Sequence, residues 1–356
     1  MSRLALLLLS VGIFLGSASA FARTVTISLV GTNDLHGHID RLPVLAGYLA
    51  NLRAARARDG GGVVLVDAGD MFQGTLESNL GEGAAVVAAY NAMGYAAAAV
   101  GNHEFDFGPE GEAATPKGPS DDARGALLAR AREAHFPFLA GNILEVQTGQ
   151  RVTWPNMPAS TLVTIAGVKL GIVGVSTEST PFTTIAANFR GLRMAPLALT
   201  VLREAAALRA AGAVVGVAVA HAGGECRRFD DPRDISSCEP REELFELARA
   251  LPTGSVDAIF GGHTHAGIAH LVAGVPVVES FSAGRAFGRV DLTVDLEDKT
   301  VEDAKVFPPT ELCAKGGKGS DCTIGAYEGA PVTPDASITA ILAPHVERAK
   351  ARKAKK

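Results

Sequence analysis

Short apolar runs rich in valine and alanine alternate along this chain with longer segments rich in alanine and leucine. The short runs are typical of buried strands and the longer segments of helices. Their alternation indicates a layered α/β architecture. We expect strands at 25–30, 63–66, 96–100, 138–140, 168–175, 214–220 and 256–260, and helices at 42–58, 83–93, 122–134, 197–211 and 241–250.

The pattern changes after these segments. Residues 268–306 contain closely spaced strands and turns, which predict a series of antiparallel hairpins covering one edge of the sheet. We therefore expect a single domain over 23–308. Residues 309–330 are rich in glycine, lysine and cysteine and have no periodicity, so we expect a loop there. The remainder of 309–356 predicts a helix to residue 348 and a basic tail.

The first 22 residues have the three parts of a secretory signal peptide. A basic start at Arg3 precedes an apolar stretch over 4–15, and small residues then lead to a cut after Ala22 or, as the alternative, after Ala20. The apolar stretch is shorter than the ~20 residues of a membrane-spanning helix, and no later stretch reaches that length. We expect a signal peptide at 1–22, a periplasmic or secreted mature protein and no transmembrane segment.

Charge and cysteine content narrow the choice of partner and compartment. The formal net charge is −5, which argues against a nucleic acid polymer as partner. All four cysteines lie in polar or glycine-rich segments, and in an oxidising compartment they predict two local disulfides, although four cysteines allow three pairings. The predicted pairs are Cys226–Cys238 and Cys313–Cys322.

Polar side chains able to bind metals follow five of the apolar runs, where the strands are expected to end. The segments are Asp34-Leu35-His36, Gly69-Asp70, Gly101-Asn102-His103, His221 and Gly262-His263-Thr264-His265. The C-terminal ends of strands gather ligands in α/β sheets. Four imidazoles, two carboxylates and one amide are too many ligands for one zinc-type ion and suit two. A pair of ions ~3.5–4 Å apart needs a bridging carboxylate, and Asp70 is the natural candidate.

This ordered set resembles the calcineurin-like metallophosphoesterase superfamily, and within it the periplasmic 5′-nucleotidase and UDP-sugar hydrolase family. The motifs that carry the resemblance are Asn33-Asp34-Leu35-His36-Gly37-His38, Asp67-Ala68-Gly69-Asp70, Gly101-Asn102-His103-Glu104-Phe105-Asp106 and Gly261-Gly262-His263-Thr264-His265. The resemblance implies a four-layer αββα sandwich, with two mixed sheets flanked by helices, as the catalytic domain over 23–308.

The resemblance also implies a role for each site residue. Asp34, His36, Asp70 and His265 would hold one metal ion, and Asp70, Asn102, His221 and His263 the other. A hydroxide bridging two cations attacks phosphorus at neutral pH, while the cations neutralise the phosphoryl oxygens. His103 and Asp106 would form a catalytic dyad, in which His103 protonates the leaving group and Asp106 fixes its tautomer. The mixed ligands fit Zn, Mn, Fe or Co.

Other polar and aromatic residues receive weaker interpretations. We expect Glu104 to be structural, and Asn142 is as well explained by a turn at a strand end as by contact with substrate. The only tryptophan, Trp154, and the scattered aromatic residues do not indicate a stacking platform. The remaining histidines are expected in surface or loop positions: His38, His135, His270 and His345.

The leading functional prediction is a secreted, dinuclear metal-dependent phosphohydrolase of the 5′-nucleotidase type. We expect a monomer that takes a nucleotide or another small phosphoester. Full-length members of the family carry a C-terminal domain that binds the nucleoside, and we expect this chain to lack it. The alternatives are a phosphodiesterase acting on cyclic nucleotides or nucleotide-sugars, a thiohydrolase of sulfur oxidation, and a non-catalytic binding protein that keeps the metals as structural staples.

Overall fold

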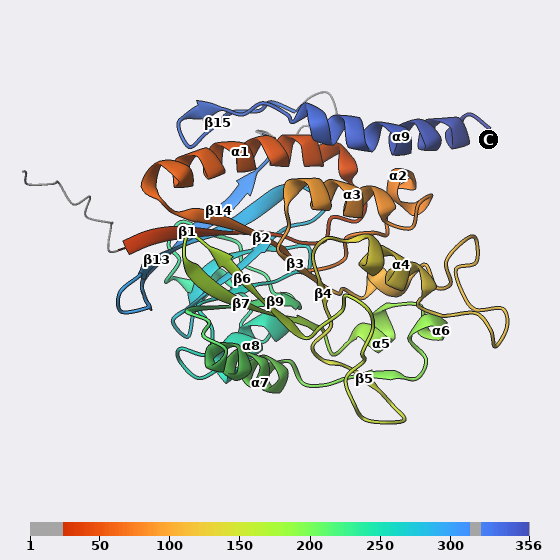
Figure 1. Ribbon diagram of the computed structural model, residues 1–356, viewed down its shortest axis with the longest axis horizontal. Helices are drawn as coiled ribbons and strands as arrows, with labels where there is room; N and C mark the ends of the chain where they lie inside the picture. Colours follow the sequence, from red (N-terminus) through yellow and green to blue (C-terminus); the bar gives the residue numbers. More distant parts are fainter. Residues whose placement is uncertain (1–23, 314–321, 356) are drawn as a thin grey trace, which may run out of the picture.

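Two six-stranded sheets form the centre of the molecule in the computed structural model, which describes residues 24–313 and 322–355 (Figure 1). The first sheet has the order β14-β13-β1-β2-β3-β4. Strands β1 to β4 are parallel, whereas β13 pairs antiparallel with β1, and β14 pairs antiparallel with β13. The strands are β1 (Thr24–Thr32), β2 (Gly62–Asp67), β3 (Ala97–Ala99), β4 (Phe138–Leu139), β13 (Ala286–Asp295) and β14 (Thr300–Glu311).

The second sheet has the order β11-β12-β10-β9-β7-β6 and is also mixed. Its four central strands are parallel, and each edge strand runs antiparallel to its neighbour. The strands are β6 (Ser160–Ile165), β7 (Val168–Ser176), β9 (Val215–His221), β10 (Ala258–Phe260), β11 (Gly267–Val272) and β12 (Val275–Ser280).

Side-chain alternation along the strands gives each sheet two buried faces. In β2, Val64 and Val66 face the core between the two sheets, whereas Leu65 faces the helices. The outer face of the first sheet packs against α1 (Leu42–Asp59), α3 (Ala84–Met93) and α4 (Gly125–Glu133), and α9 (Ala336–Lys353) packs on α1 and α3. The second sheet packs against α7 (Leu197–Ala210) and α8 (Glu243–Ala250). The predicted αββα sandwich is therefore confirmed, with α1 and α7 on opposite sides in Figure 1.

Short elements complete the fold around these layers. The helices are α2 (Leu76–Asn79), α5 (Thr180–Thr183) and α6 (Ala186–Phe189), with single 3₁₀ turns η1 (Ile39–Arg41), η2 (His103–Phe105) and η3 (Ile235–Ser237). Two small ladders pair β5 (Ile143–Glu145) with β8 (Leu192–Met194), and β15 (Ala326–Tyr327) with β16 (Ala330–Pro331). Most of these were not expected, because segments of two to four residues carry too little periodicity to read.

The hairpins predicted over 268–306 do not cover a single edge. The β11–β12 hairpin forms one edge of the second sheet, whereas the β13–β14 hairpin forms one edge of the first. The chain crosses between the sheets after Ser280, and the spacing of strands and turns does not encode that crossing. The predicted loop also begins later than residue 309, because β14 continues to Glu311.

The C-terminal helix is part of the packed structure. Asp335 caps α9 by accepting hydrogen bonds from the backbone N–H groups of Ser337 and Ile338. Ile338 and Leu342 are buried in the same core as α1 and α3, and α9 lies along α1 in Figure 1. None of the helices in residues 24–313 and 322–355 is long and apolar enough to cross a bilayer. The predicted signal peptide at 1–22 lies outside the described residues.

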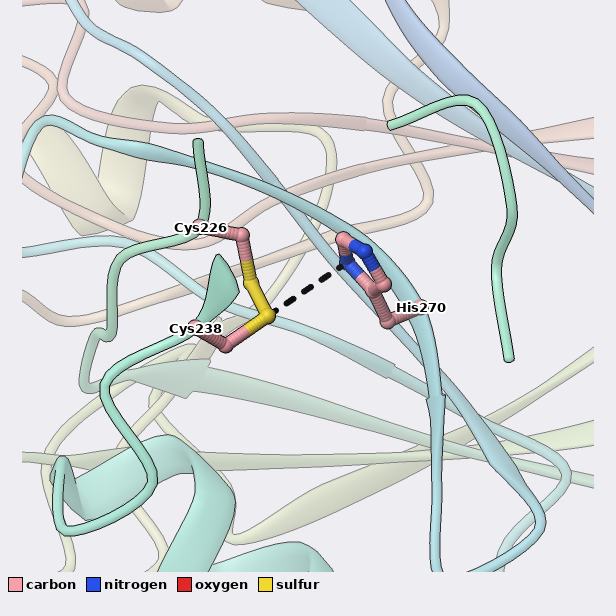
Figure 2. A group of neighbouring side chains, drawn as sticks. All are labelled: Cys226, Cys238 and His270. Carbon is pink, nitrogen blue, oxygen red and sulfur yellow. Dashed lines mark hydrogen bonds between the residues drawn. A yellow bond between two sulfur atoms is a disulfide. The ribbon is translucent and has the colours of Figure 1, made fainter. Parts of the chain in front are cut away.

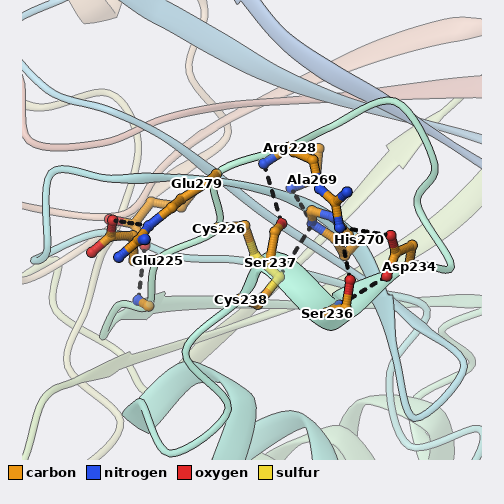
Figure 3. Close-up of a disulfide and its surroundings, with 12 residues drawn as sticks. Glu225, Cys226, Arg228, Asp234, Ser236, Ser237, Cys238, Ala269, His270 and Glu279 are labelled. Atoms are coloured by element: carbon orange, nitrogen blue, oxygen red, sulfur yellow. Dashed lines mark hydrogen bonds and ion pairs between the residues drawn. A yellow bond between two sulfur atoms is a disulfide. The ribbon is translucent and has the colours of Figure 1, made fainter.

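Both predicted disulfides are confirmed, Cys226–Cys238 and Cys313–Cys322. The first lies beside His270, whose Nδ1 is 3.9 Å from Cys238 Sγ (Figure 2). His270 is completely buried in β11, so its predicted surface or loop position is wrong. The error arises because the loop 226–238 covers β11 and buries His270. The disulfide joins the two ends of this loop (Figure 3). Of the other three histidines, His135 is exposed and His38 and His345 are half-buried.

Candidate metal centre

All seven predicted ligands lie at the C-terminal ends of strands, and both sheets contribute. Asp34 follows β1, Asp70 follows β2 and Asn102 follows β3, while His221 ends β9 and the segment with His263 and His265 joins β10 to β11. In each sheet these strands are neighbours and parallel. The common direction of the strands therefore brings together side chains from distant parts of the sequence.

Asp34, His36 and His265 form one group of possible ligands. The Nε2 atoms of His36 and His265 are 3.0 Å apart. Asp34 Oδ1 lies 3.4 Å from His265 Nε2 and 4.0 Å from His36 Nε2. Two ligands that bind one ion at ordinary bond lengths are separated by about 3–3.6 Å, so these spacings are close to those of a single site.

Asp70, His221 and His263 form a second group. Asp70 Oδ2 lies 3.1 Å from His221 Nε2, and Asn102 Oδ1 lies 2.9 Å from the same nitrogen. The rings of His221 and His263 have centroids 5.1 Å apart. The Asn102 amide nitrogen donates to the carbonyl of Thr183, which leaves its oxygen facing the group.

Asp70 lies between the two groups. The Oδ2 atom that contacts His221 is also 3.9 Å from His36 Nε2 in the first group. The other carboxylate oxygen accepts a hydrogen bond from the backbone N–H of His103 at 2.8 Å. This position fits a carboxylate that is shared by two cations.

Backbone carbonyls fix the orientation of two ligand rings. His36 Nδ1 donates to the carbonyl of Gln73 at 2.7 Å, and His221 Nδ1 donates to the carbonyl of Ala68 at 2.8 Å. A neutral ring whose Nδ1 carries the proton has its lone pair on Nε2, and both Nε2 atoms face the centre. Lone pairs of nitrogen and oxygen therefore converge, and the donor set fits divalent cations.

The pKa values of two ligand histidines shift in opposite directions. Burial, reinforced by the neighbouring His221, lowers the pKa of His263 to about 4, so this ring is neutral at pH 7. Burial also tends to lower the pKa of His221, but the Asp70 carboxylate outweighs it and raises the pKa to about 10. A proton on His221 thus balances the negative charge of the Asp70 carboxylate, which a bound metal ion would otherwise neutralise.

Five of the seven predicted ligands have left-handed backbone conformations, which are uncommon for residues other than glycine. Their φ angles are 48° for Asp34, 48° for His36, 57° for Asp70, 82° for His263 and 58° for His265. Each conformation costs on the order of 1 kcal/mol and turns the side chain out of the strand direction. Backbone strain concentrated at one centre is typical of a functional site.

Gly101 and Glu104 build the turn that supports Asp70. Glu104 is buried and accepts hydrogen bonds from the backbone N–H groups of Asp70, Met71 and Gly101, at 2.9, 2.7 and 2.7 Å. A Cβ atom on Gly101 would lie 2.1 Å from Asp70 Oδ1, so only glycine fits there. The geometry accords with the structural role expected of Glu104.

His103 and Asp106 lie at the same turn, in η2 and directly after it. His103 Nδ1 donates to Asp106 Oδ2 at 2.5 Å, and Thr184 Oγ1 donates to Asp106 Oδ1 at 3.0 Å. The hydrogen bond to Asp106 is the main cause that raises the pKa of His103. The His103 ring lies 5.3 Å from that of His36, centroid to centroid, and is partly exposed. His103 can therefore exchange protons with solvent beside the ligand groups.

Two residues that support this centre, Asn33 and Thr184, had no role predicted from the sequence. Asn33 donates to Asp34 Oδ2 at 2.7 Å and accepts from the backbone N–H of Ser280 at 2.9 Å. Thr184 holds the far side of Asp106. Thr184 belongs to a segment rich in serine and threonine, 176–184, but the neighbouring residues do not indicate that its partner is Asp106. Asn142 hydrogen-bonds the backbone of Ser176 in both directions, as expected of a turn residue at a strand end.

Two relatives each match about two thirds of this chain. The protein UshA of Salmonella pullorum is 31% identical over 256 residues, which make up 68% of this chain and 41% of UshA. The 5′-nucleotidase of Vibrio vulnificus is 28% identical over 254 residues, or 68% of this chain and 40% of that protein. The chain thus matches less than half the length of these two relatives.

The solved structure of calcineurin-like phosphoesterase YfkN from Bacillus subtilis has the same fold, with a TM-score of 0.67 at 18% identity. The match covers 92% of this chain and 98% of that one. A sequence profile of calcineurin-like phosphoesterases matches residues 27–267, a range that contains both ligand groups and the His103–Asp106 pair. The chain therefore belongs to the calcineurin-like phosphoesterase family of metal-dependent phosphoric ester hydrolases.

Proposed function

We propose that this protein is a dinuclear metal-dependent phosphohydrolase that cleaves phosphate monoesters, with 5′-nucleotides as its substrate class. The observation that carries the proposal is the sharing of Asp70 Oδ2 by two ligand groups, with His103 attached through its backbone to the other oxygen of the same carboxylate. The substrate class comes from relatives whose names include 5′-nucleotidase. Because the chain matches only 40% of the length of that 5′-nucleotidase, the activity needs a direct test.

The ligand roles in this proposal follow the two groups. Asp34, His36, Asp70 and His265 hold one ion, and Asp70, Asn102, His221 and His263 hold the other. When bound, two ions would supply a water of lowered pKa as the nucleophile, and their positive charge would neutralise the phosphoryl oxygens. The carbonyls of Gln73 and Ala68 keep the His36 and His221 rings in the tautomer that binds cations.

In this proposal His103 supplies the proton to the departing alkoxide. Its Nδ1 is committed to Asp106, which leaves Nε2 as the atom that protonates the leaving oxygen. Thr184 fixes Asp106 from the other side, so the ring is held in one orientation. A general acid that is positioned in this way contributes about 10²–10⁴-fold to the rate.

Export from the cytoplasm is a further part of the proposal. Support comes from the sequence of residues 1–22 and from two disulfides, because disulfides persist mainly in oxidising compartments.

Metal-dependent phosphate release tests the proposed function. The protein, stripped with a chelator and reloaded with Mn²⁺, is assayed with a panel of 5′-nucleotides, an aryl phosphate monoester and an aryl phosphate diester. We expect phosphate release from the monoesters that disappears with the chelator and returns with the metal. Turnover of the diester alone would identify a phosphodiesterase. No metal-dependent turnover of any substrate would contradict the proposal and favour a non-catalytic role.

Substitution of Asp106 by asparagine is expected to change the pH profile. His103 must carry a proton to act as the acid, so kcat/KM falls as the pH rises through the pKa of His103. Asp106 raises that pKa, and its removal lowers it. The descending limb of the profile of kcat/KM against pH should therefore move to lower pH in Asp106→Asn. A limb at the same pH in both proteins would exclude His103 as the group that titrates.

A further inference from the structure

The short helix α5 lies at the rim of the candidate metal centre and is bonded to it at three points. Ser179 Oγ, just before the helix, is 3.5 Å from His263 Nε2. The carbonyl of Thr183, at its end, accepts from the amide of Asn102. Thr184 donates to Asp106. These bonds fix α5 beside both the second ligand group and the residue that orients His103.

Phe182 is the third residue of this helix, and 88% of its surface is exposed. It is the most exposed large hydrophobic residue of the described chain and the one aromatic among those that are exposed. Its backbone N–H donates to the carbonyl of Ser179 at 2.8 Å, so the backbone that presents the ring is held in place. An apolar ring in water has no stabilising role in the fold itself.

Other aromatic residues near the centre are already packed. Phe105 contacts Trp154 and Phe189 edge to face. Phe281 packs edge to face on Phe229, and the guanidinium of Arg285 covers it at 4.0 Å. No ring or cation contact is recorded for Phe182 within residues 24–313 and 322–355. Unlike Phe105 and Phe281, Phe182 is therefore free to receive a ligand.

We propose that Phe182 is a specificity-determining residue that stacks against a flat, aromatic part of the leaving group, such as the base of a nucleoside. The inference rests on the proposed phosphohydrolase function and adds the part of the substrate beyond the phosphate. The leaving oxygen takes its proton from His103, so the leaving group emerges beside His103 and Asp106. Phe182 stands two residues before Thr184, which bonds Asp106, so its exposed ring belongs to the segment fixed beside the residue that orients His103.

A pair of substrates that differ only in the flat group tests this inference. Adenosine 5′-monophosphate and ribose 5-phosphate carry the same scissile ester, but only the first has a base. Stacking of a base on an aromatic side chain is worth about 1–3 kcal/mol by alanine substitution. We therefore expect Phe182→Ala to lower the ratio of the two kcat/KM values, nucleotide over sugar phosphate, about tenfold. Phe182→Trp should keep the ratio of the wild type.

Leu199→Ala provides the matched control, because Leu199 on α7 is also exposed, at 68%, and no bond joins it to the ligand groups. In Leu199→Ala the ratio of the two kcat/KM values, nucleotide over sugar phosphate, should equal that of the wild type. Equal losses on both substrates in Phe182→Ala would assign the residue to the stability of α5 and overturn the inference, as would no loss on either. If the wild type releases phosphate from neither substrate with Mn²⁺ present, the proposed function itself fails, and that result is distinct from an unchanged ratio.

Discussion

Replacement of Asp70 by asparagine is expected to remove most bound metal and to lower kcat/KM about 10³-fold, because interactions with both ions are worth several kcal/mol in the transition state. Asp70 Oδ2 is the atom common to the two ligand groups. Asparagine keeps the shape of the side chain and tolerates a φ of 57°, so the substitution removes charge with little change in the backbone.

Elemental analysis of the purified variant, together with its kcat/KM for a 5′-nucleotide, checks this prediction. Asp303→Asn, at an exposed position of β14, is the control and should retain two ions per chain and wild-type activity. Circular dichroism establishes that both variants are folded. Two ions and full activity in Asp70→Asn would show that the carboxylate does not bridge the groups.

Replacement of His103 by asparagine is expected to lower kcat by about 10²–10⁴-fold while leaving the metal content unchanged. The ring of His103 is in neither ligand group, although its backbone N–H is bonded to Asp70. Asparagine preserves that backbone bond and removes the proton donor. The separation of turnover from metal binding distinguishes a general acid from a ligand.

Turnover of an aryl phosphate with a good leaving group sharpens this test. A leaving group that departs as a stable anion needs little protonation, so the loss in His103→Asn should be smaller for an aryl phosphate than for a nucleotide. His135→Asn, at an exposed histidine outside both groups, is the control. Equal losses for the two substrates would assign His103 to positioning, and a loss of metal would assign it to binding.

The sequence predicted the α/β layers well where the pattern was long. The helices α1, α3 and α7 and the strands β1, β7 and β9 lie within a few residues of their expected positions. Their periodicity extends over enough residues to separate helix from strand. The assignment of hairpins to sheets could not be predicted in the same way, because the crossing after Ser280 depends on packing between layers and not on local pattern.

The ligand segments were visible for a related reason. Each follows an apolar strand, and the ends of parallel strands must meet at one edge of a sheet. The supporting roles of Asn33 and Thr184 were not predicted because each depends on a partner far along the chain. Asn33 accepts from a residue 247 positions away, and Thr184 donates to one 78 positions away. Phe182 was overlooked since exposure is not a property of sequence.

The division of the ligands between two sheets determines when in folding a metal ion can be held. The backbone N–H of His263 donates to the Asp34 carboxylate across 229 positions of sequence. Contacts over such separations form late, because the intervening chain must first be ordered. We therefore expect an ion to enter a fold that is almost complete. Metal supply should then govern the slowest refolding phase and leave the earlier formation of each sheet unchanged.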